Sequence, residues 1–412
     1  MKIHLIGIGG IGVSALAQYY LSKGHQVSGS DLVASEITED LKKKGIKIFI
    51  GNSAENIKQD LDLVVYSPAV KSDNSELLSA KSYKLNAKSY PEALGDLTKQ
   101  YYTIAISGAH GKSTTTAMIA LILIKAGLDP TVIVGTKLKE FGNSNFRFGK
   151  SKFLVIEACE YDGSFLNYSP KIIVVTNIDK EHLDYFKTFA NVKKAFKNFI
   201  AKLPSEGHLV KDVSLKNHLA KKIKRILKVP GQHNVLNALS AIQVARILGI
   251  PDEITFKALS EFTGTWRRFE ECEVKIGGCK VKIVSDYAHH PNEILATFQA
   301  AREKYKKQNI WCVFQPHQRQ RTYYLFNDFV KVFRQAPIDK IIITDIYDVA
   351  GRETKKISGE VSSEKLVKKI NKKNVLYFPF DNLEGYIKEN IKNSDVLIIM
   401  GAGDIYKLAD KF

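Results

Sequence analysis

Residues 102–114 read YTIAISGAHGKST, and this stretch decides the fold of the middle of the chain. The apolar run 102–107 predicts a buried strand, and residues 112–126 predict a helix. A glycine-rich turn between a strand and a helix is the arrangement that holds phosphates. Glycines let backbone N–H groups approach the oxygens, and the helix N-terminus adds partial positive charge. The stretch therefore predicts a phosphate loop within an α/β domain.

Within this loop we predict that Lys112 reaches the β- and γ-phosphates of ATP and that Ser113 ligates Mg²⁺. The spacing is shorter than in the common phosphate loop, because only two residues separate the two glycines. The alternative is a glycine turn that carries a surface lysine. We assign seven consecutive residues to ATP binding: Gly108, Ala109, His110, Gly111, Lys112, Ser113 and Thr114.

Two later segments carry groups that suit the same site. Glu157 directly follows the apolar run 153–156, and His182 lies shortly after the run 172–176. In an open parallel sheet the carboxyl ends of the strands line the ligand crevice, so these groups are expected to converge on the nucleotide. A carboxylate and a hydroxyl are ligands that suit Mg²⁺. A histidine is less usual there, and an ordinary polar or core histidine is the alternative for His182.

The N-terminus carries a second glycine pattern. Residues 7–12 read GIGGIG after the predicted strand 2–6, and Asp31 lies 19 residues beyond Gly12 at the end of the next predicted strand. Taken alone, this is the fingerprint of a dinucleotide-binding fold. A nicotinamide-dependent oxidoreductase is therefore a competing class, although it leaves the phosphate loop without a role.

The length and pattern of the chain predict several α/β domains. The 412 residues are 44% hydrophobic, and strand-like runs alternate with helix-length segments nearly throughout. This alternation predicts mostly parallel sheets. We divide the chain into a Rossmann-like domain at 1–98, a central phosphate-loop ATPase domain at 99–265 and a C-terminal Rossmann-like domain at 266–412.

The composition of the chain limits where the protein is expected to be located and which partners it is expected to bind. The formal net charge is +18, but the lysines are scattered over segments typical of solvated helix faces, and we predict no nucleic-acid partner. A basic P-loop protein that binds nucleic acid is the remaining alternative. A basic surface also steers polyanionic small substrates. The sequence has no apolar run long enough to span a membrane and no secretory signal, so we expect a cytoplasmic protein without membrane insertion.

Four segments together resemble the Mur ligase family. They are GAHGKST at 108–114, EACEYDGSFL at 157–166, NIDKEHLD at 177–184 and GQHNVLN at 231–237. The resemblance implies three domains, with ATP and Mg²⁺ as cofactors. It further implies that Ser113 and Glu157 bind one Mg²⁺, that His182 binds a second, and that Asn234 faces the adenine. Glu160 is a second-choice metal ligand.

The N-terminal domain resembles the alanine-adding branch of that family in GIGGIGVSALA at 7–17, VSGSD at 27–31 and YSPAV at 66–70. In that branch this domain holds the UDP part of a sugar nucleotide. One departure is the SYPE segment at 89–92, where many of these ligases have an Arg. The residues that we assign to the UDP-sugar are Gly9, Gly10, Ile11, Gly12, Asp31, Ser67 and Arg268.

The C-terminal domain carries three similar segments: WRRFE at 266–270, DYAHHP at 286–291 and QPHQRQRT at 315–322. The last resembles the alanine-adding branch, but Gln318 and Arg319 replace an Arg and a Tyr. The clamp on the acceptor carboxylate is therefore expected to be rearranged, with Arg319 as a candidate substitute. We assign four residues to amino-acid binding: Tyr287, His289, His317 and Arg321. The segment Ala350–Gly351 also resembles the branch.

The resemblance implies an ATP-dependent ligase that joins L-alanine to the lactyl carboxylate of UDP-N-acetylmuramate through an acyl phosphate, for peptidoglycan synthesis. The catalytic residues implied are Lys112, His182, His289 and Arg321. We expect a monomer or a weak homodimer. A ligase that recycles a tripeptide is the alternative within the family, and a nicotinamide-dependent oxidoreductase is the alternative from another class.

Overall fold

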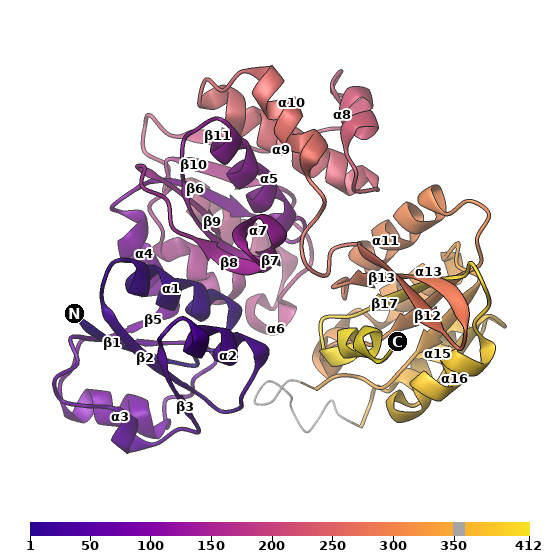
Figure 1. Ribbon diagram of the computed structural model, residues 1–412, viewed down its shortest axis with the longest axis horizontal. Coiled ribbons are helices and arrows are strands. Elements are labelled where there is room, and N and C mark those ends of the chain that lie inside the picture. The colour runs from indigo at the N-terminus through magenta and orange to yellow at the C-terminus, as the bar shows by residue number, and fades with distance from the viewer. Residues whose placement is uncertain (349–358) are drawn as a thin grey trace. The chain divides into compact units, whose positions relative to one another are not determined.

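The computed structural model describes residues 1–348 and 359–412, which fold into three sheets (Figure 1). The segment Ala350–Gly351 lies outside the described residues. The chain divides into two compact units: unit 1 is Met1–Ser214 with Asn237–Leu259, and unit 2 is Leu215–Leu236 with Ser260–Phe412. None of the helices in the described ranges has the length and the apolar character needed to cross a membrane.

The first sheet is fully parallel, in the order β3-β2-β1-β4-β5. The direction of winding reverses between β1 and β4, and a reversal of this kind opens a ligand crevice at the carboxyl ends of the strands. The glycine segment after β1 and Ser67 after β4 meet there. The elements are β1 (Lys2–Ile6), α1 (Ile11–Ser22), β2 (Gln26–Asp31), α2 (Glu36–Lys43), β3 (Lys47–Ile50), the 3₁₀ helix η1 (Ala54–Asn56), β4 (Leu63–Tyr66), α3 (Ser75–Ser82), β5 (Ala87–Ser89) and α4 (Tyr90–Thr98).

The central sheet has the order β11-β10-β6-β9-β7-β8, and only the β7–β8 pair is antiparallel. The strand before the phosphate loop, β6, lies between β9 and β10. The segments that follow these three strands therefore lie at one edge of the sheet, as expected. The strands are β6 (Tyr102–Ser107), β7 (Thr131–Leu138), β8 (Ser144–Arg147), β9 (Phe153–Glu157), β10 (Ile172–Val175) and β11 (His208–Val210).

Helices cover this sheet and continue into the segments beyond it. They are α5 (Lys112–Lys125), η2 (Lys139–Phe141), η3 (Tyr161–Asn167), α6 (Leu183–Phe186), α7 (Phe189–Ile200), α8 (Ala220–Ile226), α9 (Gln232–Ile247) and α10 (Asp252–Glu261). From Ala117 to Ile124 the side chains of α5 are all apolar, and Ile119, Ile122 and Leu123 are fully buried. Such a helix packs closely on the sheet and holds its N-terminus at the end of β6.

The third sheet has the order β12-β13-β17-β14-β15-β16, with β12 antiparallel to β13 at one edge. Apolar clusters cover both of its faces. The elements are β12 (Glu270–Ile276), β13 (Cys279–Asp286), α11 (Pro291–Lys304), β14 (Ile310–Phe314), α12 (Arg319–Tyr324), α13 (Phe326–Gln335), β15 (Lys340–Ile343), α15 (Ser363–Ile370), β16 (Val375–Tyr377), η4 (Phe380–Asn382), α16 (Leu383–Asn390), β17 (Val396–Met400) and η5 (Asp404–Lys411).

The strand predicted at 102–107, where the apolar run is continuous, is confirmed as β6. The sequence pattern missed five strands: β5, β7, β8, β11 and β12. Of these, β5 and β11 have only three residues each, too few for a pattern. The edge strand β12 reads EECEVKI and exposes most of its charged side chains, so it lacks an apolar run.

A buried polar network joins the first domain to the β7–β8 hairpin within unit 1. The Asn145 Oδ1 atom accepts a hydrogen bond from Gln18 Nε2 at 2.9 Å, and its Nδ2 atom donates to Ser14 Oγ at 2.9 Å and to the Ile11 carbonyl. Asn145 is only 6% exposed. Nearby, Lys137 pairs with Glu36 of α2 at 2.8 Å. The hairpin is therefore held against α1 and α2 by specific polar contacts.

Replacing Asn145 by Leu should destabilise unit 1. The substitution leaves buried polar groups of Gln18 and Ser14 without their partner, which costs about 1–3 kcal/mol. Thermal and urea unfolding of the full chain would measure the loss. The matched control is Asn52→Leu in an exposed loop, which should change stability by less than about 0.5 kcal/mol. Equal stability of the two variants would contradict the role of the network.

Candidate active site

The phosphate loop is held in place by Asn177, which follows β10. The Asn177 Oδ1 atom accepts the His110 N–H at 2.9 Å, and its Nδ2 atom donates to the His110 carbonyl at 2.9 Å. The Asn177 carbonyl accepts the Ala109 N–H at 3.1 Å. Thr176 Oγ1 also donates to the His110 carbonyl, at 2.6 Å. These bonds satisfy the polar backbone groups in the middle of the loop and define its shape.

Both glycines of the loop are required by close contacts. Gly108 has φ +137°, and a Cβ atom there would lie 2.0 Å from Thr176 Oγ1. Gly111 has φ +84°, and a Cβ atom there would lie 2.4 Å from Asn237 Oδ1. Any other residue would combine backbone strain with a steric clash. This local geometry accounts for the two glycines of the GAHG pattern.

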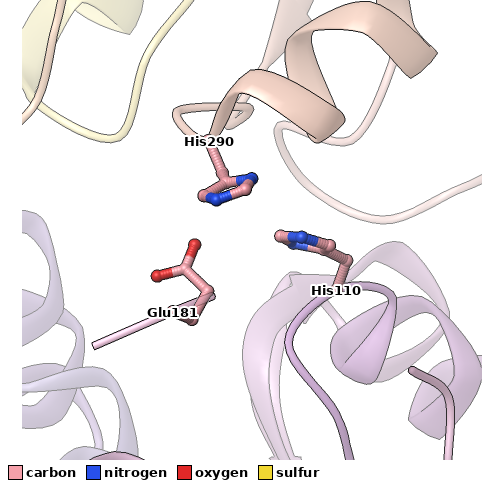
Figure 2. A group of neighbouring side chains, drawn as sticks. All are labelled: His110, Glu181 and His290. Carbon is pink, nitrogen blue, oxygen red and sulfur yellow. The ribbon is translucent and has the colours of Figure 1, made fainter. Parts of the chain in front are cut away.

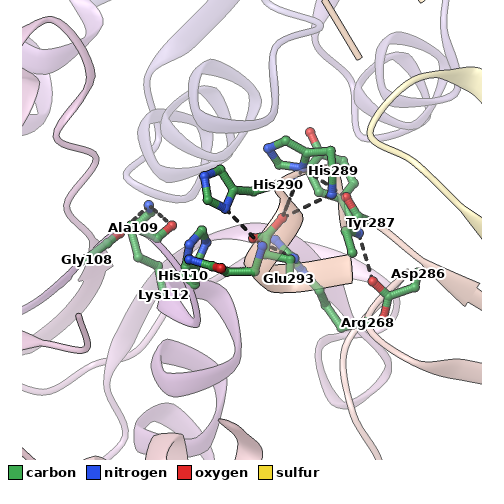
Figure 3. Close-up of polar contacts among 12 residues, drawn as sticks. Gly108, Ala109, His110, Lys112, Arg268, Asp286, Tyr287, His289, His290 and Glu293 are labelled. Atoms are coloured by element: carbon green, nitrogen blue, oxygen red, sulfur yellow. Dashed lines mark hydrogen bonds and ion pairs between the residues drawn. The ribbon is translucent and has the colours of Figure 1, made fainter. Parts of the chain in front are cut away.

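Lys112 begins α5 and folds back over the loop (Figure 3). Its Nζ atom donates to the carbonyls of Gly108 at 2.5 Å and Ala109 at 3.2 Å. It also lies 3.2 Å from the carboxylate of Glu160, which is 1% exposed. Burial by itself lowers the pKa of Lys112, but its acidic neighbours, Glu160 first among them, together outweigh that effect and raise the pKa above the ordinary lysine value. The ammonium therefore keeps its positive charge at the loop.

The predicted metal ligands lie around this lysine. Glu157 ends β9 and accepts the Gly135 N–H at 2.5 Å. Glu160 follows in a non-helical segment, so it does not lie one helical turn from Glu157. Its carboxylate is 3.8 Å from His182 Nε2. Ser113 is buried in the first turn of α5, next to Lys112. A hydroxyl and two carboxylates form a set that fits Mg²⁺, and the assignment of Ser113, Glu157 and His182 as ligands stays a prediction.

His182 is oriented by its own backbone and by an aromatic neighbour. It has φ +56° and precedes α6, and its ring lies 4.9 Å from the Tyr161 ring in an edge-to-face arrangement. The structure therefore brings Lys112, Glu160 and His182 into one group. Glu160, our second-choice ligand, is the residue that connects the other two.

Two acidic residues beside the loop were missed. His110 Nε2 lies 3.1 Å from the carboxylate of Asp179, and a ring nitrogen of His110 lies within 4.8 Å of a carboxylate oxygen of Glu181 (Figure 2). Glu181 is only 5% exposed. Both acids belong to the NIDKEHLD segment. The feature of the sequence that could have identified them is that this segment follows a strand of the same sheet.

The glycine segment of the first domain forms a cradle for an anion. Gly10 caps α1 without a side-chain hydrogen bond, and the first turn of α1, with Ile11 and Gly12, contains no acidic residue. Its backbone N–H groups and the helix dipole therefore favour a negatively charged ligand. Asp31 Oδ2 accepts the Gly9 N–H at 2.8 Å. The predicted UDP-sugar residues of the first domain thus come together.

Ser67 supports the same segment from the end of β4. Its backbone N–H donates to the Ile6 carbonyl at 2.9 Å. A Cβ atom on Gly7 would lie 2.9 Å from the Ser67 Cβ, so the two residues are in close contact. Gly7 has φ +78°, which also requires glycine. Ser67 is therefore placed to contact a ligand held by the glycine segment.

Within unit 2, Asp286 shapes the turn that carries Tyr287 and His289. Its carboxylate accepts the Ala288 and Phe269 N–H groups, each at 2.8 Å, and burial raises its pKa. His289 Nδ1 lies 3.0 Å from the Tyr287 carbonyl (Figure 3). The next residue, His290, caps α11 and accepts the Asn292 N–H at 3.3 Å.

Arg268 and Asn234 also belong to unit 2. The Arg268 guanidinium lies over the Tyr287 ring at 4.9 Å and approaches Glu293 at 3.9 Å. Asn234 is 6% exposed near the start of α9, and its side chain donates to the Pro230 carbonyl at 2.7 Å. Their predicted contacts with the UDP-sugar and with adenine stay predictions.

The other acceptor residues assemble at the end of β14. His317 stacks on Tyr347 with ring centroids 5.6 Å apart and an interplanar angle of 8°. Arg321 lies 3.1 Å from His317 Nδ1, and His289 lies 6.0 Å from His317 between ring centroids. Arg319 points elsewhere, since its side chain contacts Asp348 at 3.0 Å and the Val361 carbonyl at 3.3 Å. Arg321, rather than Arg319, shares this group with the two histidines.

Comparison with known proteins identifies the family. Three family profiles match: "Mur ligase family, catalytic domain" at residues 2–102, "Mur ligase middle domain" at 106–226 and "Mur ligase, glutamate ligase domain" at 267–403. The UDP-N-acetylmuramate–L-alanine ligase of Acetivibrio thermocellus is 42% identical over 100% of this chain and 95% of that protein. The chain belongs to the Mur ligase family. The expected family is confirmed, and the nicotinamide-dependent oxidoreductase is not retained.

Further Mur ligases also match this chain in sequence or in structure. The UDP-N-acetylmuramate–L-alanine ligase of Clostridium botulinum is 40% identical over 100% of this chain and 97% of that protein. The crystal structure of the UDP-N-acetylmuramate–alanine ligase of Thermotoga maritima matches with a TM-score of 0.82 and 29% identity, over 100% of this chain and 98% of that one. The predicted three-domain α/β fold is confirmed. A second Mur ligase of Thermotoga maritima, MurF, crystallised with ADP, shares the fold at 16% identity and a TM-score of 0.61, over 88% of this chain and 96% of that one.

Removing the side chain of Asn177 should loosen the phosphate loop of this Mur ligase. Asn177→Ala deletes both bonds to the His110 backbone, and we expect the affinity for ADP to fall about tenfold, as for the loss of one or two hydrogen bonds. Calorimetric titration would measure it. The control is Asn191→Ala, which deletes a side-chain bond to the Phe186 carbonyl away from the loop. Unchanged ADP affinity in Asn177→Ala would contradict the clamp.

Proposed function

We propose that this Mur ligase uses ATP to join L-alanine to the lactyl carboxylate of UDP-N-acetylmuramate, in the synthesis of peptidoglycan precursors. The observation that carries the proposal is the charged Lys112, held at a clamped phosphate loop beside Glu160. The choice of L-alanine rests on the full-length relatives that are named for that reaction and on His317 and Arg321, which match the alanine-adding pattern.

The proposed reaction has two steps. The lactyl carboxylate attacks the γ-phosphate of ATP, the bond to the β-phosphate oxygen breaks, and an acyl phosphate and ADP form. The amine of L-alanine then attacks the acyl carbon, loses a proton and displaces phosphate. Lys112 stabilises the negative charge that develops on the transferred phosphoryl group. Two Mg²⁺ ions, one held by Ser113 and Glu157 and the second by His182, would supply further positive charge at the phosphate oxygens.

The remaining groups bind and orient the substrates. The glycine segment 9–12 and the N-terminus of α1 bind the diphosphate of the sugar nucleotide, with Asp31, Ser67 and Arg268 as further contacts. Arg321 holds the carboxylate of L-alanine, since its planar guanidinium suits a bidentate contact. His289 is our candidate for the base that takes the proton of the amine.

Each of the three predicted domains is assigned one substrate. We propose that residues 1–98 bind the UDP-sugar, that 99–265 bind ATP and that 266–412 bind the amino acid. A cytoplasmic location, a monomer or weak homodimer, and the lack of a nucleic-acid partner stay predictions.

The direct test is the release of phosphate from ATP in the presence of Mg²⁺, UDP-N-acetylmuramate and each amino acid in turn. We expect release with L-alanine, together with a product whose mass is that of the two substrates less one water. Release with the tripeptide but not with L-alanine would replace the proposal by the recycling ligase. Absence of release with every acceptor would contradict the proposed reaction.

Lys112→Ala should abolish turnover while UDP-N-acetylmuramate still binds, because Lys112 belongs to the phosphate loop and not to the glycine segment of the first domain. Phosphate release and calorimetric titration of the sugar nucleotide would measure the two properties. The control is Lys125→Ala at the other end of the same helix, which should keep its activity. A Lys112→Ala variant with the rate of the unmodified enzyme would show that the loop assignment is wrong.

A further inference from the structure

Tyr90 is a first-domain residue that none of the assignments above includes. It begins α4, directly after β5, and its ring reaches the first turn of α1 within the same unit. A Cβ atom on Gly12 would lie 2.8 Å from both the Cζ and the hydroxyl oxygen of Tyr90. The third glycine of the GxGxxG pattern therefore leaves room for the Tyr90 phenol. That close contact puts the hydroxyl beside the anion cradle at the start of α1.

The helix that Tyr90 begins, α4, also packs against η3, which directly follows Glu160 in the central domain. Burial raises the pKa of Tyr90, and the negative charges of Glu157 and Cys159 raise it further. Helix α4 thus contacts both α1, which begins at the glycine segment, and the segment that follows Glu160.

The Tyr90 hydroxyl forms no hydrogen bond with any residue in the ranges 1–348 and 359–412. The comparison within the same unit is Tyr19, whose hydroxyl lies 3.3 Å from that of Tyr101. Tyr90 is partly buried, and a tyrosine hydroxyl at the edge of a binding site can take its polar partner from the ligand. Because the neighbouring helix N-terminus favours negative charge, an anionic oxygen of a ligand is the partner that fits this position.

We propose that the Tyr90 hydroxyl donates a hydrogen bond to an anionic oxygen of the sugar nucleotide at the start of α1. The proposal rests on the proposed function, and it names a binding residue in the segment where many alanine-adding ligases have an Arg. The phenol supplies a donor without a positive charge. The accepting oxygen belongs either to the diphosphate or to the lactyl carboxylate.

Tyr90→Phe removes the donor and keeps the ring. We expect the Kd for UDP-N-acetylmuramate to rise about tenfold, as for the loss of a hydrogen bond to a charged group. The Kd for ADP and the midpoint of thermal unfolding should stay unchanged. Tyr19→Phe is the matched control, because it deletes the hydroxyl that pairs with Tyr101 and should leave the Kd for the sugar nucleotide unchanged.

Calorimetric titration of the full chain with UDP and with UDP-N-acetylmuramate identifies the accepting oxygen. Weaker binding of both ligands to Tyr90→Phe assigns the bond to the diphosphate, and weaker binding of UDP-N-acetylmuramate alone assigns it to the carboxylate. Equal affinity of the variant and the unmodified chain for both ligands overturns the proposal. If the unmodified chain binds neither ligand, the proposed function fails instead, and the two failures are thereby distinguished.

A second variant distinguishes the loss of a hydrogen-bond donor from a loss of packing. Tyr90→Arg introduces a donor of comparable reach, and it should bind UDP-N-acetylmuramate more tightly than Tyr90→Phe does. If the Arg and Phe variants bound equally weakly while both kept the unfolding midpoint, the hydroxyl would not act as a donor.

Discussion

Asn177 holds the phosphate loop by three hydrogen bonds, two from its side chain to the backbone of His110 and one from its carbonyl to Ala109. Four residues between a strand and a helix have polar backbone groups that neither element can satisfy, and a short loop adopts one conformation only if another segment supplies the partners. Here the next strand along the sheet, β10, carries that segment. The position of Lys112 depends on this loop, because its ammonium bonds to two of the loop carbonyls.

A buried positive charge is stable only if a negative charge lies close to it. The carboxylate of Glu160 pairs with Lys112 and also approaches His182, so it connects the loop with the segment after β10. Within unit 1 a further connection runs through the β7–β8 hairpin. Gly135 of β7 bonds to Glu157, while Lys137 and Asn145 of the same hairpin bond to α2 and α1. The hairpin therefore contacts both the carboxylate beside the phosphate loop and the helix that begins at the anion cradle.

The chain differs from its family at positions where the replacement has an observable structural role. Arg319, in place of a Tyr, pairs with Asp348 and leaves Arg321 next to His317. In the SYPE segment, where many of these ligases have an Arg, Tyr90 lies against Gly12. A guanidinium and a phenol can both donate a hydrogen bond, but only the guanidinium carries a positive charge. Both Arg319 and Tyr90 lie outside the phosphate loop.

The amino-acid sequence by itself determined the α/β class, the two glycine loops and the family. Continuous apolar strands such as β6 and β14, and glycines such as Gly108 with positive φ, are local requirements that leave a local pattern. The tertiary structure decided which groups meet. Glu160 rather than Glu157 contacts Lys112, and Asp179 and Glu181 lie beside His110, because the order of β9, β6 and β10 in the sheet sets these distances. Tyr90 reaches Gly12 from 78 residues further along the chain. Such contacts depend on the pairing of distant strands, and no sequence spacing encodes that pairing.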